Sequence, residues 1–315
     1  MVVIFFPVAG VVLSGGGHGH HTFVAGGSTP VTAAQFWEKA LPGTPMPKSI
    51  VDLVNKGVHH SPLGEQYYAA AAAAWRPDAC FGYSYRINCG GPGEVAASGF
   101  FFHEAAVRVG ATMNVTLPPE PTASFLPRDV ADKIPFFFPY LADALAMFKV
   151  APGSAEAAEM SQTLRGCEAP PLADEQKACA TSLEGVVEAA ARMLGGGAMW
   201  AAASAYPAAG LARREYAVEA VAPFAGGCCN AACHGTRWPY AVYNCHASAG
   251  PSKAYVVTLR GGATVAMAAL CHRDTSNWNP EHPALVALGT RPGGAPVCHF
   301  LPYGDLMFGK KATNA

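Results

Sequence analysis

The hairpin AYVVTLRGGATVAMAALCH (residues 254–272) decides the fold of the second half of this chain. Gly261-Gly262 between two alternating runs is typical of a two-residue turn that joins antiparallel strands. Neighbouring side chains of a strand point to opposite faces. One face of the second run is bulky and carries Val265, Met267, Ala269 and Cys271. The other face carries Thr264, Ala266, Ala268 and His272. We predict that the bulky face is core and that the face of small residues is open, with room for an ion or a ligand.

The pair that ends this hairpin is one of four Cys-His dipeptides, all in the last third of the chain. They are Cys233-His234, Cys245-His246, Cys271-His272 and Cys298-His299. With 10 Cys and 11 His in 315 residues, chance gives roughly 0.35 such pairs. Because the two side chains of a pair on a strand diverge, they cannot easily bind the same ion. We therefore interpret the four cysteines as a buried disulfide set and the four histidines as a metal site.

Two alternatives use the same residues. A pair of Cys2His2 zinc sites is one, although zinc fingers space their ligands by two to five residues within a pair. The other is purely structural, with disulfide cysteines beside hydrogen-bonded histidines. Imidazole ligands suit copper, zinc or nickel, and in an oxidising compartment copper is the leading choice.

The composition limits the function classes. A net charge of −1 gives no indication of nucleic acid or of an anionic membrane as partner. The even count of ten cysteines favours an oxidised, secreted protein. Residues 2–13 form an apolar run that is too short to span a bilayer but long enough for the core of a signal peptide. In a secreted chain Asn114, in the sequon Asn114-Val115-Thr116, is a candidate glycan site.

The chain divides into five predicted segments. They are a signal peptide with a Gly/His-rich linker (1–26), a short helical leader (27–60), a low-complexity linker (61–97), the main domain (98–309) and a tail (310–315). The leader holds two small helices, the first capped by Thr32, with too few apolar residues to fold alone. The linker contains Cys80 and Cys89, which are candidates for a local disulfide, and clustered aromatic residues.

The main domain is predicted to be α+β. Two strands, in 100–109 and 112–117, precede helices near 139–148, 155–166 and 181–194. After Gly197 the pattern is all antiparallel strand. The order is thus a helical N-terminal half followed by a β half that carries the four Cys-His pairs. Cys167 and Cys179 flank the loop between two helices and are expected to pair.

The motifs of this domain resemble those of the plant BURP-domain family. The quoted stretches are CHGTRWPYAVYNCH, LCHRDTSNWNPEHPAL, PVCHFLPYGDLMFG, FFFHEAAVRVGATMNV, FLPRDVADKIPF, MSQTLRGCEAP and KACATSLEGVVEAA. The resemblance covers roughly residues 98–309. The leader FWEKALPGTPMPKSIVDLVNKG is similar to that of RAFTIN-type members, which are associated with anthers and pollen. Cys228 and Cys229 depart from the family pattern and leave the disulfide map open by at least one bond.

The resemblance implies a secreted protein of the cell wall or apoplast that acts in anther, pollen or seed development, with matrix components as partners. Some family members are copper-dependent peptide cyclases that cross-link Tyr or Trp of a core peptide in their own chain. For this chain the resemblance then implies copper on His234, His246, His272 and His299. Three roles are open for His282: a further metal ligand, a residue that supports the ligands, or an ordinary surface histidine. The candidate core-peptide aromatics are Tyr67, Tyr68 and Trp75, without the repeats typical of fused cyclases.

Overall fold

The predicted hairpin is present in the computed structural model of the protein as two ten-residue strands, β8 (Ser252–Gly261) and β9 (Ala263–His272). The two-residue turn predicted at Gly261-Gly262 is wrong in detail, because Gly261 pairs with Ala263. Gly262 alone therefore forms the tip, with a φ of 91° that favours glycine. A side chain at Gly261 would meet the Tyr216 ring at 2.5 Å. The two glycines are therefore needed for different reasons, one for backbone conformation and one for space.

The structure describes residues 32–59, 96–119, 123–224, 229–248 and 250–311. These residues belong to one compact unit, Thr32–Ala315. The predicted signal peptide and most of the predicted linker lie outside them. Within the described ranges, no helix is both long and apolar enough to cross a membrane.

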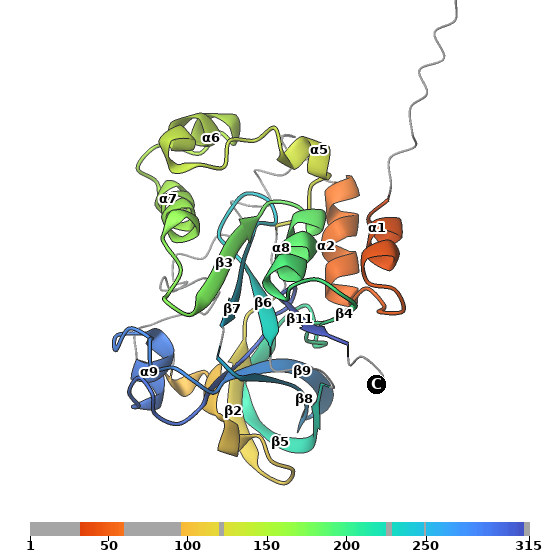
Figure 1. Cartoon of the computed structure of the whole chain (residues 1–315), viewed down its shortest axis with the longest axis vertical. Coiled ribbons are helices and arrows are strands. Elements are labelled where there is room, and N and C mark those ends of the chain that lie inside the picture. Colours follow the sequence, from red (N-terminus) through yellow and green to blue (C-terminus); the bar gives the residue numbers. More distant parts are fainter. Residues whose placement is uncertain (1–31, 60–95, 120–122, 225–228, 249, 312–315) are drawn as a thin grey trace, which may run out of the picture. The chain divides into compact units, whose positions relative to one another are not determined.

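Two antiparallel sheets form the domain, which confirms the α+β class (Figure 1). The first has six strands in the order β1-β10-β9-β8-β5-β2. Its other strands are β1 (Phe101–His103), β10 (Val297–Phe300), β5 (Leu211–Pro223) and β2 (Thr112–Leu117). The second sheet has five strands in the order β3-β7-β6-β11-β4. They are β3 (Glu175–Ala180), β7 (Tyr243–Ser248), β6 (Asn230–Gly235), β11 (Leu306–Lys310) and β4 (Met199–Ala202).

Most of the helices gather around the five-stranded sheet, whereas α9 (Pro283–Leu288) packs on the six-stranded sheet. The α-helices are α1 (Ala33–Ala40), α2 (Lys48–His59), α5 (Arg128–Ala131), α6 (Leu141–Met147), α7 (Ala155–Glu168), α8 (Leu183–Met193) and α9 (Pro283–Leu288). Two 3-10 turns are η1 (Glu104–Ala106) and η2 (Phe138–Tyr140). The three long helices predicted in the domain correspond to α6, α7 and α8. Two elements were not predicted from the sequence. Strand β3 lies between α7 and α8, and helix α9 interrupts the stretch that was predicted to be all strand.

The apolar residues form layers on and between the sheets. One core packs α1, α2 and α8 on the outer face of the five-stranded sheet, where Figure 1 shows these helices side by side. Another covers the outer face of the six-stranded sheet and includes α9. A small core joins the facing sides of the two sheets, through Ala268 and Leu270 of β9 with Ala232 and Met307. The fourth holds α5, α6 and α7 around Trp238 and Tyr240.

The prediction of an open face on β9 is wrong. Val265, Met267, Ala269 and Cys271 do belong to a core, but Ala268 and His272 are also buried. The five-stranded sheet covers this side of β9, and small side chains allow the two sheets to approach each other. The space that the sequence suggested is therefore an interface between sheets.

The two leader helices are part of the same unit as the domain. Thr32 caps α1 as predicted, in a reciprocal capping box with Gln35. Apolar side chains of both helices pack in the core that α8 covers; they are Trp37, Leu41, Ile50 and Leu53. Helix α2 is also held at its polar side, where the Tyr303 hydroxyl donates to Asp52 Oδ2 over 2.6 Å. Helices too small to fold alone are thus stabilised by docking.

One buried acid on α7 makes the stability of the protein depend on pH. Glu159 is 5% exposed, and burial raises its pKa from 4.5 to about 7 despite the nearby Arg237. Its contribution to stability is therefore fully present below about pH 4.5 and is lost as the pH rises through 7. We expect Glu159→Gln to be more stable than the wild type at pH 8 by about 2–3 kcal/mol, with little difference at pH 5.

Urea unfolding at the two pH values measures this effect. Asp143→Asn, which removes an exposed carboxylate on α6, is the matched control and should not change the pH dependence. A wild type and a Glu159→Gln variant with parallel pH profiles would contradict the prediction.

Candidate metal centre

The four Cys-His pairs lie on four strands in the central parts of the two sheets. Strands β6 and β7 carry the first two pairs, and β9 and β10 carry the last two. The cysteines face outward in both sheets: Cys233 and Cys245 lie in the core under α8, and Cys271 and Cys298 lie in the outer core of the other sheet. Alternation along each strand therefore directs the histidines inward.

The cysteines of neighbouring strands are joined in pairs. Cys233–Cys245 links directly opposed residues of β6 and β7, and Cys271–Cys298 does the same for β9 and β10. The predicted disulfide set is thus confirmed for these four residues. The alternative of two Cys2His2 zinc sites is wrong, because a sulfur in a disulfide is not a thiolate that can bind zinc.

The four imidazoles form a closed ring between the two sheets, in which each one contacts two others. The distances between ring centroids are 5.3 Å for His234–His246, 5.7 Å for His246–His272, 5.5 Å for His272–His299 and 5.2 Å for His299–His234. Two of the rings come from each sheet. The arrangement brings together all four histidines that the sequence analysis selected.

Every ring is held through its Nδ1 atom by an oxygen. His234 Nδ1 lies 2.7 Å from Asp305 Oδ2, and His246 Nδ1 lies 3.2 Å from Glu175 Oε1. The partners of the remaining two rings are the Ser248 hydroxyl, 3.4 Å from His272, and the Phe300 carbonyl, 3.1 Å from His299. Carboxylate and carbonyl oxygens only accept, so Nδ1 carries the proton in three of the rings. Their Nε2 atoms then keep the lone pair that a metal needs.

Burial keeps two of the rings, His272 and His299, uncharged. His234, His272 and His299 are at most 3% exposed, whereas the His246 side chain is 14% exposed. Burial lowers the pKa of His272 and His299 well below the usual value, and the neighbouring histidines lower each further. At neutral pH these imidazoles are therefore neutral, which is the form that binds metal.

The described residues do not already form a closed metal cage. No group of three or more His, Cys, Asp or Glu in the described ranges is placed so that it could hold an ion as it stands. His272 Nε2 is nevertheless buried and makes no hydrogen bond within those ranges. A buried ring nitrogen in this state has no protein partner that competes with a metal. The set thus fits a transition metal by donor type and by burial, and the rings would have to move to bring their donors to one point.

His282 has a different role from the four. It is buried rather than at the surface, and its Nδ1 accepts from the Ala284 N–H at 3.2 Å as the N-cap of α9. Its ring packs on Trp278 with centroids 4.2 Å apart. Burial lowers its pKa to about 4. We interpret His282 as a helix cap that supports Trp278.

The residues that hold the rings were not selected from the sequence. Asp305 lies in the stretch PVCHFLPYGDLMFG, a few residues after Cys298-His299. An acidic residue this near a Cys-His pair is the signal that could have identified it. Asp305 also accepts a hydrogen bond from the Gly235 N–H. Glu175 and Ser248 carry no such signal, because only the pairing of β3 with β7 brings Glu175 next to His246.

The remaining predicted residues divide into two groups. The predicted Cys167–Cys179 disulfide is present, and Asn114 is exposed on the edge strand β2. Cys229 packs at the edge of the core under α8. Six residues lie outside the described ranges: Tyr67, Tyr68, Trp75, Cys80, Cys89 and Cys228.

Comparisons with known proteins identify the domain. The family model for the BURP domain matches residues 100–310. The chain is 44% identical to BURP domain-containing protein 13 of Oryza sativa subsp. japonica, 46% identical to Protein RAFTIN 1A of Triticum aestivum and 36% identical to Protein RAFTIN 1B of Triticum aestivum.

The extent of these matches differs. They cover 78%, 71% and 100% of this chain, in the same order. They cover 64% of the rice protein and 58% of RAFTIN 1A, but 98% of RAFTIN 1B. The chain thus spans less than two thirds of the first two relatives and nearly the whole length of the third.

Proposed function

The chain belongs to the BURP-domain family and is related to the RAFTIN proteins, and on that premise we propose that it is a secreted plant protein whose four inner histidines bind one copper ion. The observation that carries the proposal is the ring of four imidazoles, each anchored at Nδ1 by an oxygen. Carboxylate partners on ligating histidines orient the ring and raise its basicity. Asp305 and Glu175 would have this role toward His234 and His246.

Copper is favoured over zinc by the ligand set. Four imidazole nitrogen donors bind Cu²⁺ more tightly than Zn²⁺ in the usual order of affinities. When bound, copper would supply one-electron redox chemistry that no side chain of the protein provides. The protein's own contribution would be to orient the four imidazoles, to hold His272 and His299 neutral, and to keep water away from three of the rings.

Secretion and the biological setting complete the proposal. Three disulfides among the described residues suit an oxidising compartment. Asn114 is exposed on an edge strand, where a glycan can attach without disturbing the core. From the similarity to the RAFTIN proteins we infer a role in anther, pollen or seed development, and we propose cell-wall components as partners.

The test is a copper titration of the metal-free protein with its disulfides intact. We expect about one copper per chain, and a loss of at least tenfold in affinity for His246→Ala. His246 is the most exposed ring of the four, so its removal should disturb folding least. His103→Ala removes a partly buried histidine of β1 outside the ring and should leave copper binding unchanged. Equal copper binding by wild type and His246→Ala would refute the site.

The same protein can be examined for the alternative, autocatalytic cyclase activity. A cross-link at Tyr67, Tyr68 or Trp75 removes two hydrogens, and so does a disulfide between Cys80 and Cys89. Peptides must therefore be reduced and alkylated before mass spectrometry. A mass loss that requires copper, oxygen and His246 would extend the proposal to catalysis, and an unchanged mass would limit it to copper binding.

A further inference from the structure

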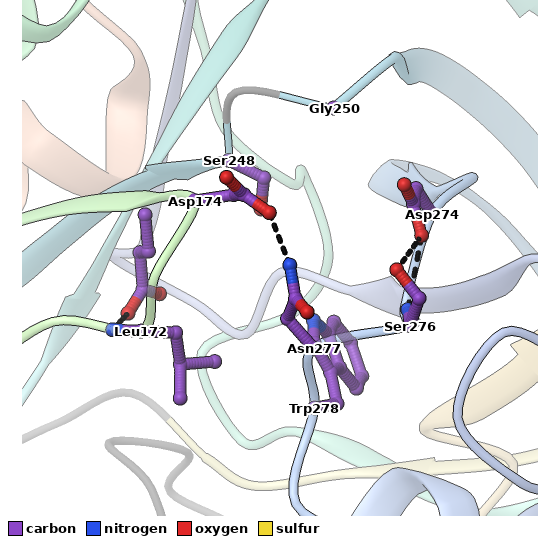
Figure 2. Close-up of a pocket in the computed structure, with 9 residues that line it drawn as sticks. Leu172, Asp174, Ser248, Gly250, Asp274, Ser276, Asn277 and Trp278 are labelled. Carbon is purple, nitrogen blue, oxygen red and sulfur yellow. Dashed lines mark hydrogen bonds between the residues drawn. The ribbon is translucent and has the colours of Figure 1, made fainter.

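A pocket lies beside the histidine ring, where loops from both sheets meet (Figure 2). One wall comes from the segment that leads into β3, a second from Ser248 at the end of β7 together with Gly250, and a third from the loop after β9. The residues that line it are Leu172, Asp174, Glu175, Ser248, Gly250, Asp274, Ser276, Asn277 and Trp278. We call it the acidic pocket.

The inner wall of the acidic pocket contacts the ring of histidines directly. Glu175 holds His246, Ser248 holds His272, and the Trp278 ring meets the His272 ring at 5.1 Å between centroids. His246 is also the ring member with the most exposed side chain. A molecule in the acidic pocket would therefore lie one side chain away from His246 and His272.

The pocket concentrates negative charge in a chain whose net charge is only −1. Neither Asp174 nor Asp274 forms an ion pair with a Lys or Arg in the part of the chain that the structure describes. The nearest basic residue in sequence, Arg273, pairs with Glu104 instead. The side chain of Lys177 donates to two backbone carbonyls at the end of α7. The carboxylates are thus available to a cation from outside.

Local hydrogen bonds hold Asp174 and Asp274 in place. Figure 2 shows Asp174 facing Asn277, whose amide donates to it, while Asp274 faces Ser276 and accepts from its hydroxyl and its N–H. Glu175 is held by its contact with His246.

Trp278 supplies an aromatic surface beside the carboxylates. It is partly exposed, and its contacts with His282 and His272 fix its position. Carboxylates next to an indole suit an organic cation on an aliphatic stem, since the stem packs on the ring and the charge meets both the ring and the carboxylates.

We propose that the acidic pocket binds the side chain of an arginine or lysine of a peptide, and that it places the neighbouring residue of that peptide next to His246. The position of the neighbouring residue beside His246 matters only if the proposed copper site exists, so this part of the proposal rests on the proposed function. Binding of the arginine or lysine side chain in the acidic pocket needs no metal. The peptide would be the molecule on which the histidine site acts.

The test uses the metal-free full chain with intact disulfides and two matched peptides. N-acetyl-Gly-Arg-Gly-amide is the probe, and its citrulline counterpart has nearly the same shape without the charge. Nuclear magnetic resonance reports binding through the indole N–H signal of Trp278, which a Trp278→Phe variant assigns among the five tryptophans. We expect the arginine peptide to shift this signal and to bind at least about tenfold more tightly than the citrulline peptide.

Two variants test the assignment to the carboxylates. Asp174→Asn with Asp274→Asn removes both charges but keeps an oxygen acceptor for Asn277 and Ser276, so the loops should keep their shape. We expect about tenfold weaker binding of the arginine peptide. Asp143→Asn on α6 removes an exposed carboxylate elsewhere and should leave the affinity unchanged.

Four results would overturn the proposal. They are equal affinities for the two peptides, an equal loss in the control variant, binding of spermidine in place of the arginine peptide, and no binding of either peptide. Copper binding is measured separately on the wild type. If copper fails to bind but the arginine peptide binds, only the proposed function is refuted. If copper binds but the peptide does not, the pocket assignment alone fails.

Discussion

Changing Cys271 and Cys298 together to alanine is expected to lower the free energy of unfolding by about 2–5 kcal/mol and to abolish copper binding. The disulfide joins two directly opposed, fully buried residues of β9 and β10. Its loss frees the unfolded chain from a loop closed over 27 residues and leaves unfilled space in the core. His272 and His299 lie next to these cysteines, so loosening the two strands would also disturb two of the four rings.

Urea unfolding and copper titration measure the two effects. The matched control is the Cys167→Ala, Cys179→Ala double variant, which also removes one disulfide, but one that is only partly buried and joins α7 to β3, neither of which carries a histidine of the ring. We expect it to lose stability and to keep its copper. If both double variants lost copper equally, the effect would come from general destabilisation, and the link between this disulfide and the ring would be refuted.

Changing Trp37 to alanine is expected to lower the free energy of unfolding by about 3–5 kcal/mol, although Trp37 lies well before the residues matched by the family model. The side chain is 2% exposed in the core under α8, and its Nε1 donates to the Thr44 carbonyl at 2.8 Å. Its removal leaves a large cavity and an acceptor without its donor.

The urea midpoint of Trp37→Ala, compared with that of Lys39→Ala, checks this prediction. Lys39 is exposed on the same helix, so its change should cost less than about 0.5 kcal/mol. An unchanged midpoint for Trp37→Ala would mean that α1 does not unfold together with the domain. A lowered midpoint would make the leader helices a structural part of the domain rather than an appendage.

The limits of sequence reasoning appear most clearly at the histidine ring. Alternation along a strand sufficed to separate the cysteines from the histidines, because that rule depends only on the local backbone. It could not predict that the histidine face of β9 is buried. That outcome depends on a second sheet, whose β6 and β11 come from elsewhere in the chain. For the same reason Glu175, Ser248 and Trp278 gave no sign of their roles.

By itself, the sequence determined the local properties of this protein. They are the antiparallel hairpin, the α+β class, the helices α6 to α8, the cap at Thr32 and the opposite directions of the cysteine and histidine side chains within each Cys-His pair. All of these follow from turn chemistry and from the period of the apolar residues, which act over a few neighbours. Only the tertiary structure decided which histidines meet, which oxygens orient them, and where carboxylates from separate loops form a pocket. These are contacts between distant parts of the chain, and they exist only after both sheets have packed together.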